Sequence, residues 1–136
     1  MTNQDMIRRA AALLRPYQTP QGRLFGDVAA VAVSASGKVF DGVCVDTASW
    51  GLCAERAAMA AMITDGEYRL DRIVAVWRDP ATGRLSILPP CGTCREFMRQ
   101  VDDANLDAQI VLEPSRAVPL SALLPEHHWP APIDMD

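Results

Sequence analysis

Two short segments of the sequence hold cysteines at spacings that could bind a metal ion. Cys53 precedes Glu55 by two residues, and Cys91 and Cys94 form a Cys-x-x-Cys pair further along the chain. A third polar segment, 126–129, reads Glu-His-His-Trp. Thiolates and imidazoles are the usual protein ligands of Zn²⁺, and a carboxylate beside the metal can carry protons during hydrolysis. The cysteine segments therefore predict a metal site with a neighbouring acid–base group.

The Cys91/Cys94 pair by itself has two other interpretations. A redox dithiol of the thioredoxin type has this spacing, although a Pro-Pro dipeptide precedes this pair. A structural zinc site also has it, but such a site needs four protein ligands. The fourth would come from Cys44, His127 or His128. Cys44 alternates with valines in an expected strand, where a small buried hydrophobic residue is the simpler interpretation.

The three cysteines together favour a catalytic zinc over both alternatives. Three thiolates leave the fourth position of the metal to water, and zinc lowers the pKa of that water from 15.7 toward neutrality. Glu55 reaches the same metal only if Cys53 lies in the first turn of a helix, and it then acts as a general base and acid. Arg56 offsets the negative charge of three thiolates on Zn²⁺. The competing interpretation of Glu55 and Arg56 is an exposed charged pair.

Helices that begin at these cysteines are expected from the local pattern. Alanine-rich residues 53–65 are good helix formers, and Gly66 is a natural stop. The spacing of Phe97, Met98 and Val101 predicts the buried face of a second helix. Helix N-termini favour thiolates. The helices expected are 5–15, 53–65 and 92–101, with a helical turn at 119–124; the strands are 28–34, 38–46, 72–77, 85–88 and 109–112; residues 18–26 are turn-rich.

Length and composition limit the class of protein. A chain of 136 residues fits one domain, 1–136, and strands alternating with helices predict an α/β fold with a mixed sheet covered on both faces. The net charge of −4 argues against binding to the phosphate backbone of a nucleic acid as the main function. No run approaches the about 20 apolar residues of a membrane helix, and residues 1–9 lack an apolar signal core. We therefore expect a cytoplasmic protein without a membrane or nucleic-acid partner.

Residues 48–56 and 90–95 resemble the zinc-binding segments of small cytidine deaminases. Arg95-Glu96 and strand 73–76 are also similar to blasticidin-S deaminases. The resemblance covers about residues 28–124. It implies a three-layer α/β/α sandwich with a five-stranded mixed sheet, usually in a homotetramer. It also implies zinc held by Cys53, Cys91 and Cys94, with Glu55 as the proton shuttle and Arg56 hydrogen-bonded to the ligand thiolates.

The residues that would contact the substrate depart from that family's pattern. Cys44 stands where the family has an Asn that binds ribose, and Asp46 stands where it has a Glu. Phe25 is displaced by one position, and His128 occupies the slot of an aromatic residue that covers a neighbouring subunit's pyrimidine, with Trp129 beside it. We therefore expect cytidine to be a poor substrate or one with a high KM. The substrate-binding residues implied are Phe25, Cys44, Asp46, Ala54, His128 and Trp129.

The expected function is zinc-dependent hydrolytic deamination of an aminated pyrimidine nucleoside, such as cytidine or deoxycytidine, with release of ammonia. One alternative is deamination of a different heterocycle: a blasticidin-S-like antibiotic, a modified nucleoside or a free base. Another is a non-catalytic, zinc-stabilised binding module, which predicts a fourth protein ligand and no ammonia. The small residues of helix 53–65 favour close helix packing between subunits, hence a homotetramer.

Overall fold

A seven-stranded mixed sheet runs through the computed structural model, which describes residues 1–136. Strands β3 and β4 flank β2, both antiparallel to it, and β6 lies parallel to β4 with β7 antiparallel beside it. The two remaining strands, β1 and β5, are short and pair with one end of β2 and of β4 respectively. The strands are β1 (Tyr17–Gln18), β2 (Leu24–Ser34), β3 (Val39–Val45), β4 (Leu70–Arg78), β5 (Leu85–Leu88), β6 (Gln109–Glu113) and β7 (Arg116–Pro119).

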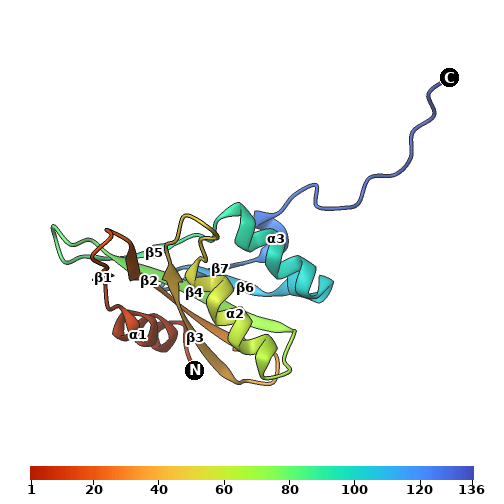
Figure 1. The fold of residues 1–136 in the computed structure, drawn as a ribbon. Helices are drawn as coiled ribbons and strands as arrows, with labels where there is room; N and C mark the ends of the chain where they lie inside the picture. The colour runs from red at the N-terminus through yellow and green to blue at the C-terminus, as the bar shows by residue number, and fades with distance from the viewer.

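Helices cover both faces of this sheet (Figure 1). Helix α1 (Asn3–Leu13) packs on one face, and α2 (Ala54–Thr64) and α3 (Gly92–Val101) pack on the other. Met98 of α3 is fully buried, as its spacing predicted, with Phe97 and Val101 partly buried against the same core. The three-layer α/β/α arrangement and the mixed sheet are confirmed.

The sheet differs from the expected one at its ends. Strand β2 begins at Leu24 within the segment expected to be turns, and β1 lies in the same region. Strand β7 and the 3₁₀ turn η1 (Asp103–Asp107) were not expected, whereas the helical turn expected at 119–124 is η2 (Leu120–Leu123). The unexpected strands are short, and short strands form through pairing with neighbours more than through their own propensity.

A glycine in β3 sets how closely α2 lies on the sheet. A Cβ at Gly42 would lie 2.3 Å from the backbone nitrogen of Ala58 and 2.6 Å from the carbonyl oxygen of Ala54. Any side chain at this position would therefore push the helix away. Ala54 and Ala58 are themselves fully buried. Because the contact is backbone against backbone, the first turn of α2 is held at a defined height over β3.

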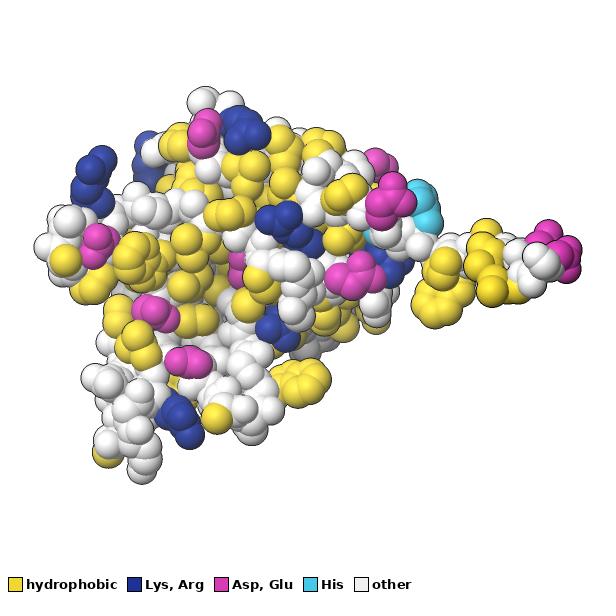
Figure 2. Space-filling view, turned by 90° about the horizontal axis from the view of Figure 1, so that it is seen from above, with side chains coloured by type: hydrophobic (Ala, Val, Ile, Leu, Met, Phe, Trp, Pro, Cys, Tyr) yellow, Lys and Arg dark blue, Asp and Glu magenta, His cyan; other side chains and the backbone are white.

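The last residues, 129–136, are exposed and extend from the body of the molecule as a tail (Figures 1 and 2). Lys and Arg side chains are interspersed with Asp and Glu over the face drawn in Figure 2. None of the helices has the length and apolar character needed to cross a membrane.

Candidate active site

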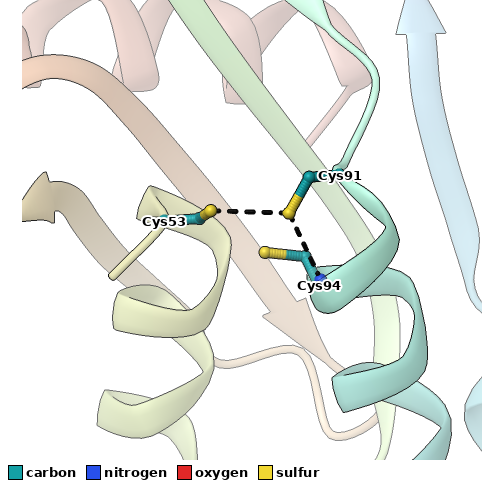
Figure 3. Close-up of side chains that lie close together, drawn as sticks. All are labelled: Cys53, Cys91 and Cys94. Atoms are coloured by element: carbon teal, nitrogen blue, oxygen red, sulfur yellow. Dashed lines mark hydrogen bonds between the residues drawn. The ribbon is translucent and has the colours of Figure 1, made fainter. Parts of the chain in front are cut away.

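Three cysteine thiols converge where α2 and α3 begin (Figure 3). Cys53 is the N-cap residue of α2, Cys91 is the N-cap residue of α3, and Cys94 lies in the first turn of α3. The sulfur atoms of Cys53 and Cys91 are 3.5 Å apart. All three sulfur atoms lie within 4.8 Å of one another. The fold thus brings the two cysteine segments, distant in sequence, into one cluster.

The cluster fits a zinc ion. Zinc–thiolate bonds of about 2.3 Å in a tetrahedron place neighbouring sulfur atoms about 3.8 Å apart, which is close to the 3.5 Å separation of the Cys53 and Cys91 sulfur atoms. All four cysteines of the chain are free of disulfides. Burial raises the pKa of the Cys94 thiol, and the Glu55 carboxylate raises it further. Three adjacent thiolates therefore need a cation to balance their charge, and Zn²⁺ is a cation that this donor set binds well.

No fourth protein ligand joins the three cysteines. The metal-binding group consists of Cys53, Cys91 and Cys94 alone. The thiol of Cys44 donates instead to a carboxylate oxygen of Asp27. The ring of His127 is bound to the carbonyl oxygen of Leu124 at 2.9 Å. The structure therefore does not contain a closed four-ligand site, and a zinc ion held by the three cysteines would have one coordination position open to water or substrate.

Glu55 lies beside this cluster and is only 6% exposed. It borders an inner cavity of about 160 Å³ together with Cys53 and Cys91. Burial raises the pKa of the Glu55 carboxyl, against the opposing effect of the neighbouring Arg56 charge. The interpretation of Glu55 as an exposed surface charge is wrong. A buried carboxyl group with a raised pKa, at the wall of a cavity, is suited to holding and transferring a proton.

Arg56 follows Glu55 in α2 and contacts the Cys53 thiol directly. Its Nη2 donates to the Cys53 sulfur at 3.6 Å and to the carbonyl oxygen of Gly51 at 3.2 Å. Its Nε is buried and has no hydrogen-bond partner. The guanidinium therefore places a positive charge against the thiolates, in the role that the resemblance implied.

A larger outer pocket of about 400 Å³ adjoins the inner cavity. Cys44 and Cys53 border both spaces, so the two are neighbours. Two of the expected substrate-binding residues, Cys44 and Asp46, line the outer pocket, and Ala54 lines the inner one. The outer pocket is lined by Leu24, Asp27, Cys44, Val45, Asp46, Gly51, Leu52, Cys53 and Arg56.

The other expected substrate-binding residues lie elsewhere within a single chain. Phe25 is paired between β1 and β3 and borders neither space. His128 and Trp129 line a separate hollow with Arg99 and Asp103. Trp129 is 94% exposed. The tail residues therefore do not line the pocket of their own chain.

Asp27 is the pocket residue that sequence reasoning missed. Its Oδ1 accepts a hydrogen bond from the Cys44 thiol at 2.8 Å. Burial raises the pKa of that thiol, and the hydrogen bond to Asp27 raises it further. The available signal was the one-residue displacement of Phe25, which marks an altered strand start just before Asp27. The contact between Asp27 and Cys44 could be identified only from the register between β2 and β3.

Comparison with known proteins gives the family. Residues 2–108 match the model of the cytidine and deoxycytidylate deaminase zinc-binding region. A cytidine deaminase of Mycobacterium tuberculosis is 34% identical over 101 residues, 73% of this chain and 70% of that protein. A probable cytidine deaminase of Dictyostelium discoideum is 30% identical over 92 residues, 66% of this chain. The chain spans 58% of the length of that relative.

A solved structure has the same fold over nearly its whole length. The crystal structure of cytidine deaminase from Burkholderia pseudomallei aligns with a TM-score of 0.70 at 27% identity, covering 93% of this chain and 98% of that one. Residues 2–108, which match the family model, contain both cysteine segments. The chain therefore belongs to the cytidine and deoxycytidylate deaminase family, a family of zinc-dependent hydrolases.

Proposed function

We propose that the protein hydrolytically deaminates an aminated pyrimidine nucleoside of the cytidine or deoxycytidine type and releases ammonia. One observation supports this most directly: the buried carboxyl group of Glu55 shares a cavity with Cys53 and Cys91. A metal site with a purely structural role needs neither an open coordination position nor a buried acid beside it. A hydrolytic site needs both.

Each part of the site has a task in this reaction. When bound by the three cysteines, Zn²⁺ supplies a Lewis acid that makes water nucleophilic near neutral pH. Glu55 removes a proton from the attacking water and gives it to the ring nitrogen next to the aminated carbon. It then transfers the proton of the newly added hydroxyl group to the amino group, which leaves as ammonia while the ring carbonyl forms. Arg56 stabilises the negative charge of the Cys53 thiolate throughout.

The apolar part of the inner cavity supports the same chemistry. Val28, Leu88 and Pro89 line it together with the polar groups. An aromatic heterocycle fits such a wall, and its burial expels water that would otherwise weaken the electrostatic interactions at the reacting carbon.

An ammonia-release screen of the zinc-loaded protein tests the proposal. The candidate substrates are cytidine, deoxycytidine, cytosine, blasticidin S and guanine, and Glu55→Gln provides the matched blank. We expect ammonia from a pyrimidine nucleoside with the unmodified protein and none above background with the variant. Ammonia only from the antibiotic or a free base would keep the chemistry and change the substrate. No ammonia from any compound, at full zinc content, would favour the binding-module alternative.

The proposal extends to a cytoplasmic homotetramer. Ala60 and Ala61 are exposed on α2, where small side chains allow a neighbouring helix to approach closely. Trp50 is 78% exposed and Trp129 is 94% exposed, which are large apolar surfaces for one chain to leave in water. The four unpaired cysteines suit a reducing compartment. Light scattering should give four times the chain mass of 14.8 kDa, and a single-chain particle at micromolar concentration would contradict the tetramer.

A further inference from the structure

A β-bulge at the start of β2 carries Asp27 to the outer pocket. Phe25 pairs with Val45 and Ala29 pairs with Val43, so residues 26–28 of β2 face the single residue Cys44 of β3. Bulges of this kind redirect side chains and occur often beside active sites. Here the extra residues bring the Asp27 side chain within hydrogen-bond distance of Cys44.

The bulge depends on a glycine with a backbone that other residues rarely adopt. Gly26 has φ of 73°. A Cβ there would also lie 2.7 Å from the carbonyl oxygen of Arg15, whose backbone nitrogen donates to the carbonyl oxygen of Gly26 at 3.1 Å. The strand start is therefore anchored to the chain that follows α1, and Asp27 is held by backbone geometry as well as by the thiol.

Asp27 gives the outer pocket an excess of hydrogen-bond acceptors. The charged side chains that line this pocket are Asp27, Asp46 and Arg56. The two carboxylates outnumber the single guanidinium, whose Nη2 donates to the Cys53 sulfur and to the Gly51 carbonyl oxygen. One oxygen of Asp27 accepts from Cys44, and the other receives no hydrogen bond from the protein. An ionised carboxylate can only accept hydrogen bonds, so the carboxylates of Asp27 and Asp46 favour hydrogen-bond donors of a substrate and repel anions.

The position of these carboxylates relative to the inner cavity decides which part of a substrate meets them. The reacting carbon must lie in the inner cavity, beside Glu55. Cys44 and Cys53 border both spaces, so the rest of the substrate extends into the outer pocket. Asp27 also borders a second hollow, which is lined by Arg78. The Arg78 guanidinium donates to the carbonyl oxygen of Gly83 at 3.1 Å and forms no ion pair with Asp27.

We infer that Asp27 is a specificity-determining residue of this site. Its carboxylate, oriented by Cys44, accepts a hydrogen bond from a hydroxyl or amino group of the substrate and excludes substrates with a phosphate in the outer pocket. The inference rests on the proposed deaminase function and assigns to Asp27 the choice between a nucleoside and a nucleotide. The family's description includes both cytidine and deoxycytidylate, and Asp27 selects the compound without a phosphate.

Deamination of deoxycytidine and of deoxycytidine 5′-monophosphate by the zinc-loaded protein tests this. Asp27→Asn keeps an oxygen that can accept from Cys44 but removes the charge. Asp107→Asn, exposed at the end of η1, makes the same change in net charge outside both the inner cavity and the outer pocket. We expect Asp27→Asn to lower the nucleoside-to-nucleotide ratio of kcat/KM by about tenfold, as removal of one nearby like charge predicts. Asp107→Asn should leave the ratio unchanged.

Higher salt provides a second readout. Because salt screens the repulsion between carboxylate and phosphate, higher salt should lower the nucleoside-to-nucleotide ratio of kcat/KM for the unmodified protein. The same ratio for Asp27→Asn should change less. If the unmodified protein deaminates deoxycytidine but Asp27→Asn has the same ratio, the inference is wrong and the proposed function stands.

A protein that deaminates neither compound contradicts the proposed function instead. Calorimetric titration of the same two compounds into the unmodified protein and Asp27→Asn then decides the inference separately. Tighter binding of the phosphorylated compound by the variant alone supports it. Equal binding by both proteins, or binding by neither, overturns it.

Discussion

The metal end and the substrate end of this site are built in different ways. At the metal end, Cys53, Cys91 and Cys94 all lie at helix starts, and Glu55 follows within the first turn of α2. At the substrate end, Asp27 comes from a bulge in β2 and Cys44 from β3, with Asp46 just beyond that strand. The first set is positioned by local helix geometry. The second depends on the register between strands.

The difference separates chemistry from selectivity. Helix starts present backbone N–H groups and a partial positive charge to thiolates, and this holds for whatever compound enters the pocket. The bulge opposite Cys44 lies in the strand region, outside the helix starts that carry the cysteines. We therefore expect substitutions at the metal end to abolish the reaction and substitutions at the substrate end to change which compound reacts.

Removal of a metal ligand should have the largest effect. Cys91→Ala should lose most of its zinc and unfold at a lower temperature, because metal binding contributes to the free energy of folding. Metal analysis and thermal unfolding measure both effects. Cys44→Ala is the matched control, since Cys44 contacts Asp27 rather than the cluster. Loss of zinc from this control would make Cys44 a fourth ligand and restore the structural interpretation.

Glu55→Gln should separate the acid–base group from the metal. We expect turnover to fall by at least about 100-fold, the lower range of general acid–base catalysis. Zinc content and fold should be retained, because the amide has nearly the same size in the buried position. Turnover is compared at matched zinc content. Near-normal activity would show that Glu55 moves no proton in the reaction.

Asp46→Ala should change selectivity more than chemistry. Asp46 lines the outer pocket, and a hydrogen bond between a charged group and a substrate hydroxyl is worth about 1.5–3 kcal/mol. We expect kcat/KM for a hydroxyl-bearing nucleoside to fall by at least about tenfold, with turnover of a free base unchanged. An equal loss on both compounds would place Asp46 in the structure of the site rather than in recognition.

Trp129→Ala should have the smallest effect. Because Trp129 is 94% exposed in the chain, we expect zinc content and stability to stay unchanged. If the tail covers the pyrimidine of another subunit, loss of an aromatic contact of about 0.5–1.5 kcal/mol raises KM by a few-fold. Steady-state kinetics of the oligomer measure this. An unchanged KM would remove the tail from the site.

Sequence patterns were sufficient for the metal end. The cysteine spacings and the alanine-rich helix predicted a thiolate cluster at two helix starts, and the structure contains that cluster at Cys53, Cys91 and Cys94. Helix starts are local features, determined by capping and by residues within about one turn, so a linear pattern describes them well. The mixed sheet between two helical layers followed for a similar reason, because alternating strands and helices pack in few ways.

The tertiary structure alone decided the substrate end. The displaced Phe25 indicated a departure from the family's sequence pattern. The bulge itself, in which three residues of β2 face one residue of β3, is a property of strand pairing, and strand pairing is non-local. The burial of Glu55 likewise could not be derived from its charge and its place beside Arg56, because burial depends on what packs over it. The sequence by itself determined which residues form the thiol cluster, through local helix chemistry. Only the folded chain decided that Asp27 faces Cys44 in the pocket, since that contact joins two strands whose register no local pattern specifies.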